Sequence, residues 1–182
     1  MKKKWISYVK MAVFTALLVF VDQLTKYLAT IHLKGKTDIT IIKNVLCLHY
    51  LDGGNTGAAW GMFSGRIMMF IVFTLVAIVL ICVFIRNIQG LIDDNYSLNI
   101  VPLKILNASM ILLMAGALGN LIDRIAHGYV IDFIYFELIN FPIFNVADCY
   151  VTVSCFIIIL ICIFKIKDSE FNKIFTLKNN VK

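Results

Sequence analysis

Four long apolar runs constrain this chain more than any other feature of its sequence. They lie at about residues 13–31, 67–85, 103–122 and 146–164. Each is close to the roughly 20 residues that an α-helix needs to cross the hydrocarbon core of a bilayer. Apolar residues fill 60% of the 182 positions, which excludes an ordinary soluble domain. The sequence therefore predicts an all-α polytopic membrane protein with four transmembrane helices.

The segments between these runs are short, so we expect a single integral membrane domain over residues 1–182. Outer loops are expected at 32–66 and 123–145, an inner loop at 86–102, and a short tail at each end. Basic residues gather before the first run and after the last. Because positively charged flanks are retained in the cytoplasm, we expect both termini on the cytoplasmic side.

The charge and cysteine content narrow the classes of partner and cofactor. The formal net charge of +6 is concentrated in the two tails, where it indicates contact with anionic membrane lipid and not a nucleic-acid site. The five cysteines and three histidines form neither a disulfide framework nor a metal-binding spacing. We therefore expect no metal and no cofactor.

The first apolar run resembles the start of a secretory signal, because basic residues precede it. It continues through Asp22 and Lys26 without a small-residue cleavage site, so we expect a retained first helix. Asp22 and Lys26 are four residues apart and are therefore neighbours on one helix face. The pair is either a plain structural ion pair or a brace for a site in the outer half of the membrane.

The first outer segment combines strand-forming and turn-forming residues. Residues 37–51 are rich in β-branched side chains, which predicts short extended strands. A glycine-rich turn with Asn55 and Gly57 follows, and its composition alone favours a plain turn before the second span. Residues 60–63 are aromatic and apolar enough to suit a short segment at the membrane interface.

Three aspartates, Asp123, Asp132 and Asp148, are concentrated between residues 115 and 148. A carboxylate at membrane depth costs roughly 2.5–3.5 kcal/mol on insertion scales, so such residues are rare and usually functional. Gly116, Gly119, Asn120 and Asp123 share one face of the third span, which predicts close contact with another helix.

Structural interpretations of these acidic residues remain open. Asp123 and Arg124 can serve as ion-pair partners elsewhere in the bundle. Asn145 can cap the fourth helix, which puts Asp148 in the first turn, where the positive end of the helix dipole suits a carboxylate.

Two facing carboxylates that share a proton, such as Asp132 and Asp148, form an acid–base pair of the kind found in aspartic proteases. One takes a proton from water while the other donates to the carbonyl oxygen of the bond to be cut. Competing chemistries have little support: the sequence has no HExxH zinc motif, no GxSxG elbow, and no histidine placed to activate Cys149.

Five short motifs resemble, in order and in the four-span layout, those of the bacterial lipoprotein signal peptidase family. They are VDQLTK (21–26), NTGAAWG (55–61), GNLIDR (119–124), VIDF (130–133) and FNVAD (144–148). The resemblance covers nearly the whole chain. It implies a membrane aspartyl endopeptidase that removes the signal peptide from diacylglyceryl-modified prolipoproteins, cutting just before the lipidated cysteine.

The resemblance also implies roles for individual residues. Asp132 and Asp148 correspond to the catalytic dyad of the family. The residues that would bind substrate or support the site are Asp22, Lys26, Asn55, Gly57, Asn120, Asp123, Arg124 and Asn145. The outer β-like cradle of the family corresponds to residues 37–51, and its short interfacial helix to 57–64.

The resemblance further implies a site near the extracytoplasmic face of the bacterial cytoplasmic membrane and inhibition by globomycin-type peptides. We expect a monomer, although the sequence does not settle the oligomeric state. Two departures from the family are small. Trp60 stands where phenylalanine is usual, and the connection between the two aspartates is short. The tail after Lys165 carries no family motif.

Two other classes of protein also place carboxylates in an apolar bundle. A small proton-coupled transporter is one, although the sequence shows no inverted repeats. An assembly subunit with a polar face for a partner helix is another, and it would tolerate Asp→Asn substitutions. An intramembrane protease of the presenilin type is disfavoured because its GxGD motif is absent.

Overall fold

The computed structural model describes residues 2–57, 65–96 and 99–175, and four long helices dominate it. They are α1 (Lys2–Leu33), α2 (Ile67–Asp93), α3 (Val101–His127) and α4 (Val146–Phe164). All four are long and apolar enough to cross a membrane. The predicted four-helix membrane architecture is therefore confirmed.

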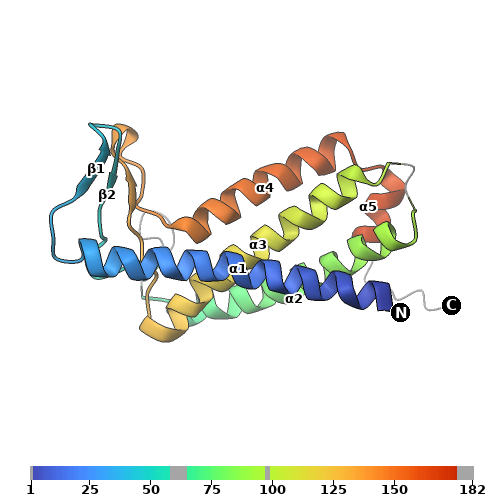
Figure 1. Cartoon of the computed structure of the whole chain (residues 1–182), viewed down its shortest axis with the longest axis horizontal. Helices are drawn as coiled ribbons and strands as arrows, with labels where there is room; N and C mark the ends of the chain where they lie inside the picture. The colour runs from blue at the N-terminus through green and yellow to red at the C-terminus, as the bar shows by residue number, and fades with distance from the viewer. Residues whose placement is uncertain (1, 58–64, 97–98, 176–182) are drawn as a thin grey trace.

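α3 is the central helix of the bundle, and it packs against α1, α2 and α4 (Figure 1). In its most apolar stretch 56% of the residues are buried inside the protein, against 11% or fewer in the other three helices. Its glycines permit this packing. A Cβ atom at Gly116 would lie 2.6 Å from the carbonyl oxygen of Ala147, and one at Gly119 would lie 2.5 Å from Asp22 Oδ2. The predicted glycine face of this helix thus contacts both α4 and α1.

A small antiparallel sheet caps the end of the bundle at which α1 ends (Figure 1). It consists of β1 (Ile39–Ile42), β2 (Leu46–Leu48) and β3 (Ile134–Phe136), in that order. The first two strands confirm the prediction for residues 37–51. The third comes from the other outer segment and is followed by a short 3₁₀ helix, η2 (Glu137–Ile139). Of the predicted interfacial helix at 57–64, only Gly57 is described, so this helix and Trp60 lie outside the described residues.

Three helices extend beyond the predicted spans: α1 begins at Lys2, well before residue 13, and α2 and α3 end later than expected. α3 continues to His127 and ends where Gly128 adopts a left-handed conformation with φ of 76°. Asp123 and Arg124 are therefore helical, although we expected them in the outer loop 123–145. α2 likewise continues to Asp93, which shortens the expected inner loop 86–102. Apolar runs mark the part of a helix that lies in hydrocarbon, whereas its ends depend on capping residues.

The C-terminal tail, for which the sequence predicted no structure, contains one more helix, α5 (Asp168–Phe175). It packs against α2 at the end of the bundle opposite the sheet (Figure 1). Ile174 and Glu170 are buried there, with 1% and 3% of their surfaces exposed. The tail thus belongs to the folded bundle at least as far as Phe175.

Candidate active site

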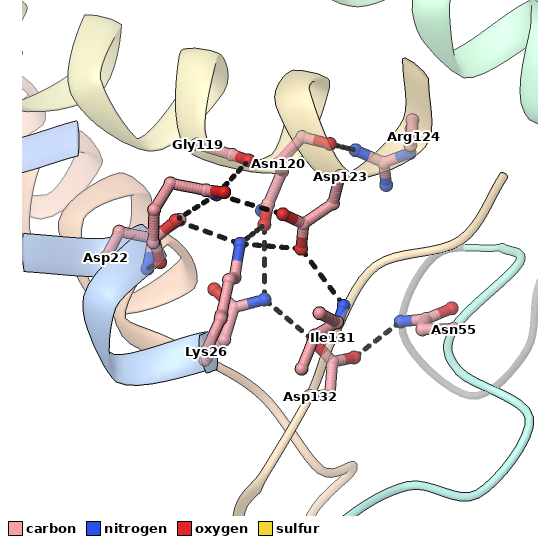
Figure 2. Close-up of polar contacts among 12 residues, drawn as sticks. Asp22, Lys26, Asn55, Gly119, Asn120, Asp123, Arg124, Ile131 and Asp132 are labelled. Carbon is pink, nitrogen blue, oxygen red and sulfur yellow. Dashed lines mark hydrogen bonds and ion pairs between the residues drawn. The ribbon is translucent and has the colours of Figure 1, made fainter. Parts of the chain in front are cut away.

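A buried ion cluster joins α1 to α3 (Figure 2). Lys26 Nζ lies 2.9 Å from Asp22 Oδ2 and 3.0 Å from Asp123 Oδ2, and no more than 1% of any of these three side chains is exposed. The same ammonium group donates to Asn120 Oδ1 at 3.0 Å. The predicted Asp22–Lys26 pair is therefore more than an ion pair within one helix. Lys26 also binds the side chains of Asp123 and Asn120 on α3.

Both carboxylates of this cluster bind main-chain groups next to the two aspartates predicted as the dyad. Asp123 Oδ2 accepts the Ile131 N–H at 3.0 Å, one residue before Asp132 (Figure 2). Asp22 Oδ1 accepts the Ala147 N–H at 2.8 Å, one residue before Asp148. A single ion cluster thus fixes the backbone at both aspartates.

Asp132 lies in an extended segment just before β3. Its carbonyl oxygen accepts the Leu51 N–H at 3.1 Å, which ties it to the first outer segment. Its carboxylate, in a side chain with only 1% of its surface exposed, accepts from Asn55 Nδ2 at 2.9 Å and from Asn145 Nδ2 at 2.7 Å. Burial, reinforced by the negative charge of Asp148, raises the pKa of Asp132 to about 7.

Asp148 lies in the first turn of α4, as predicted. Asn145 caps this helix, because its side chain accepts the Asp148 N–H at 3.0 Å while Asp148 Oδ2 accepts the Asn145 N–H at 3.1 Å. The other carboxylate oxygen, Oδ1, accepts from Asn120 Nδ2 at 2.8 Å. The prediction that Asn145 caps α4 and that Asp148 lies in its first turn is thus confirmed. The cap does not explain why Asn120 donates to the other oxygen of Asp148.

Two asparagines connect the carboxylates of Asp132 and Asp148. Asn145 Nδ2 donates to Asp132 Oδ1 and, at 3.1 Å, to Asn120 Oδ1, and Asn120 in turn donates to Asp148. Both aspartates line one cavity of about 300 Å³. Residues 141–144, just before α4, form another part of its wall. The cavity can therefore present two carboxyl groups to one bound molecule.

Arg124 and Gly57 form the edge of the same cavity. The Arg124 guanidinium donates to the carbonyl oxygens of Asn120 at 3.4 Å and Gly57 at 3.5 Å, and its Cζ lies 5.1 Å from the centroid of the Phe70 ring. The Gly57 N–H donates to Asn55 Oδ1 at 2.9 Å, which fixes the amide that binds Asp132. Nine of the ten residues predicted for the site therefore lie in the ion cluster or line the cavity, and the tenth, Asn145, is buried and donates to Asp132.

Gln23 belongs to the same network, although we did not predict a role for it. Its Nε2 donates to Asp123 Oδ1 at 2.9 Å, to the Gly119 carbonyl oxygen at 3.1 Å and to Asp22 Oδ2 at 3.3 Å. The available signal was its position next to Asp22 in an apolar run, because a buried amide requires partners.

The cluster is organised around the ammonium group of Lys26. Over residues 2–57, 65–96 and 99–175, no group of three or more His, Cys, Asp or Glu side chains is arranged to hold a metal ion. Lys26 occupies the position between the carboxylates of Asp22 and Asp123.

Comparisons with known proteins agree with this arrangement. Residues 14–164 match the family described as signal peptidase (SPase) II. A protein of Caldanaerobacter subterraneus subsp. tengcongensis named lipoprotein signal peptidase is 40% identical over 155 residues, which cover 84% of this chain and 95% of the relative. A protein of the same name from Staphylococcus epidermidis is 35% identical over 175 residues, which cover 95% and 98% of the two chains.

Solved structures show the same fold. Two structures described as bacterial membrane enzymes have TM-scores of 0.64 and 0.65 with this chain, at 30% and 31% identity. The first comparison covers 93% of each chain, and the second covers 87% of this chain and 94% of the other. The family match extends over most of the chain and includes all ten predicted site residues, so the chain belongs to the signal peptidase II family.

Proposed function

We propose that this protein is a membrane aspartyl endopeptidase that removes the signal peptide from diacylglyceryl-modified prolipoproteins, cutting just before the lipidated cysteine. Its relatives carry the name lipoprotein signal peptidase, which supports this class of substrate. The observation that carries the proposal is the single cavity of about 300 Å³ lined by both Asp132 and Asp148.

The proposed mechanism assigns different protonation states to the two aspartates. Asp132 holds the shared proton at neutral pH, because burial and the charge of Asp148 raise its pKa to about 7. The Asp148 carboxylate takes a proton from water as the water oxygen attacks the carbonyl carbon, and Asp132 protonates the carbonyl oxygen. When the tetrahedral intermediate collapses, the C–N bond breaks, the amine receives the proton from Asp148, and the oxygen returns its proton to Asp132.

The surrounding residues would hold this dyad in place before substrate arrives. Asp22 and Asp123 fix the backbone at Ala147 and Ile131, and Lys26 pairs with both of these side chains. Catalytic groups must be held within about 0.5 Å of their productive geometry. In this proposal the ion cluster orients the two aspartates and takes no part in proton transfer.

The same arrangement supports a proposal for the location and assembly of the enzyme. The segments that line the cavity include the residues before β3 and the start of α4, which lie toward the end of the bundle that the sheet caps, opposite the start of α1 (Figure 1). With the basic tails held in the cytoplasm, the dyad would lie near the extracytoplasmic face of the bacterial cytoplasmic membrane. All ten residues come from one chain, so a monomer suffices. A globomycin-type peptide would inhibit by occupying the cavity.

The test uses purified protein in nanodiscs with a diacylglyceryl-modified prolipoprotein. Cleavage by the wild type would be compared with that by Asp132→Asn and Asp148→Asn. Because general acid–base catalysis contributes about 10²- to 10⁴-fold, each variant should lose at least about 100-fold in kcat while still binding substrate. Asp38→Asn is the matched control. Asp38 is exposed, its Oδ1 lies 2.8 Å from His49 Nδ1, and neither residue lines the cavity.

The outcomes separate the proposal from its rivals. Mass spectrometry of the product should place the new N-terminus at the lipidated cysteine. Near-normal turnover by either Asp→Asn variant would make that aspartate structural. No cleavage by well-folded wild type would favour a proton-coupled transporter or an assembly subunit.

A further inference from the structure

A second, larger cavity of about 730 Å³ begins at Asp148 and extends along the bundle. Asn120, Arg124 and Asp148 line it at one end, and the same three residues line the first cavity. α3 forms its floor, and α2 and α4 form its two walls. We refer to this space between α2 and α4 as the trough. Beyond Asn120 its lining is almost entirely apolar.

The length of the trough identifies what fits in it. Along α3 it extends from Arg124 to Met110, which at 1.5 Å per residue is about 21 Å. The apolar segment of a signal peptide has about 7–15 residues, or about 10–22 Å as a helix. An acyl chain within one leaflet covers only about half of the roughly 30 Å hydrocarbon core. The trough is therefore long enough for an apolar helix that ends at Asp148. It is longer than an acyl chain that occupies one leaflet.

The lining of the trough also suits close contact with a helix. Its middle section is lined by the small side chains of Ala77 on α2 and Ala117 on α3. Helices in membranes approach each other closely where such small side chains meet. A helix in the trough would contact α2, α3 and α4 at once, and its end would lie at Asp148.

α5 closes the trough at the end opposite the dyad. Phe175, the last residue of α5, lines the trough together with Phe84 of α2, and the two ring centroids are 5.0 Å apart. α5 is firmly held: Ile174 is 1% exposed, and its carbonyl oxygen accepts from Asn87 Nδ2 at 2.8 Å. Lys173 Nζ lies 3.8 Å from the centroid of the Tyr96 ring. The Phe175 ring is therefore attached to a fixed element and not to a free tail.

We propose that the trough receives the apolar segment of the signal peptide as a helix, and that Phe175 stops this helix toward the inner face, so that α5 sets the longest apolar segment the enzyme accepts. The inference rests on the proposed peptidase function and adds to it a determinant of substrate choice. It gives the C-terminal tail, which carries none of the motifs, a role in specificity.

The test varies the length of the apolar segment in an otherwise constant substrate. Diacylglyceryl-modified prolipoproteins with polyleucine segments from about 8 to about 20 residues would be cleaved in nanodiscs, and kcat/KM measured for each. The readout is the ratio of kcat/KM for the long and short substrates within each variant, so a uniform loss of folded enzyme cancels.

The wild type should show a fall of roughly tenfold or more once the segment exceeds about 14 residues, the length of the trough. Phe175→Ala should move that limit to longer segments by about one helical turn, and Phe175→Trp should move it to shorter ones. Phe164→Ala is the matched control, because Phe164 ends α4 with 69% of its surface exposed and does not line the trough. Its length profile should match that of the wild type.

The experiment distinguishes failure of this inference from failure of the proposed peptidase function. A wild type that cleaves every length equally well, or a Phe175→Ala profile identical to the wild type, would overturn this inference and leave the peptidase function intact. A wild type that cleaves no member of the series would overturn the proposed function and the inference together.

Discussion

Lys26 pairs with two buried aspartate side chains from different helices, and its replacement should be costly. Lys26→Met would leave Asp22 and Asp123 buried without a counter-charge. Removing one partner of a buried ion pair costs about 3–5 kcal/mol, so the midpoint of thermal unfolding in detergent should fall sharply. The control is Lys43→Met, at an exposed position, where a change within about 0.5 kcal/mol is expected. Equal melting curves for the two variants would show that the cluster does not stabilise the fold.

The raised pKa of Asp132 makes both activity and stability depend on pH. Burial, with the charge of Asp148 added, places this pKa at about 7, above the usual value of about 4. If Asp132 must hold a proton to act as the acid, kcat/KM should fall as the pH rises through about 7.

The sign of the stability effect follows from linkage. Between about pH 4 and pH 7 the folded protein holds a proton on Asp132 that the unfolded chain has released. Stability from this group is therefore complete below about pH 4 and is lost as the pH rises to 7. Asp132→Asn, which cannot titrate, should lack this part of the decline when unfolding is measured at several pH values. A decline of equal size in the variant would contradict the assignment.

At the residue scale, the sequence predicted which residues belong to the site better than it predicted the hydrogen bonds and ion pairs between them. Asp22 and Lys26 could be paired from their spacing, because residues four apart on a helix are neighbours. The bond from Lys26 to Asp123 depends on how α1 packs against α3, and no local pattern encodes it. Gln23 was missed for the same reason, since its acceptors on Gly119 and Asp123 lie almost 100 residues away.

Among the elements, the contact between α1 and α3 depends on the absence of a side chain at Gly119. A Cβ there would lie 2.5 Å from Asp22 Oδ2, and Asp22 cannot move without losing Lys26 and the Ala147 N–H. Gly119→Ala should therefore destabilise the protein by about 1–3 kcal/mol and lower kcat/KM.

Gly90→Ala is the matched control, because a Cβ at that position in α2 meets nothing within 4 Å. It should be neutral, or should stabilise by about 0.5–1 kcal/mol through helix propensity. The Gly119→Ala and Gly90→Ala variants would be compared by their thermal unfolding and by their cleavage rates. A Gly119→Ala protein that behaves like Gly90→Ala would show that the two helices have room to separate.

The long apolar elements were predictable and the short ones only in part. Apolar runs gave α2 and α4 their starting points, since a span of about 20 residues leaves few alternatives. β3 has only three residues and exists because Ile134–Phe136 pairs with β2 from the other outer segment. α5 is short, and its position depends on contacts with α2 that are remote in sequence.

In the molecule as a whole, the candidate site is built where segments from the entire chain meet. α1, the turn at Asn55, the end of α3, the segment at Asp132 and the start of α4 each contribute polar groups. The resemblance of the motifs predicted which residues these would be. It did not predict that Asn145 would cap α4 and bind Asp132 at once, because that requires the two segments to be placed in three dimensions.

The orientation of the bundle in the membrane can be tested with a matched pair of asparagines. Asn44 lies in the turn between β1 and β2, and Asn95 lies just beyond α2, at the other end of the bundle. Both are exposed and both have positive φ, 58° and 47°, so a cysteine at either position carries a similar backbone strain. In a variant whose five native cysteines are replaced, Asn44→Cys and Asn95→Cys would each be exposed to a membrane-impermeant thiol reagent on intact cells.

With the proposed orientation, the cysteine at 44 reacts on intact cells, whereas the one at 95 reacts only after the membrane is permeabilised. The physical reason is that the basic tails hold the α5 end of the bundle in the cytoplasm, which leaves the sheet and the dyad outside. The reverse pattern would place the dyad at the cytoplasmic face. A substrate that reaches the enzyme from the outer leaflet could then not be cut there, so this labelling result bears on the mechanism as well as on the topology.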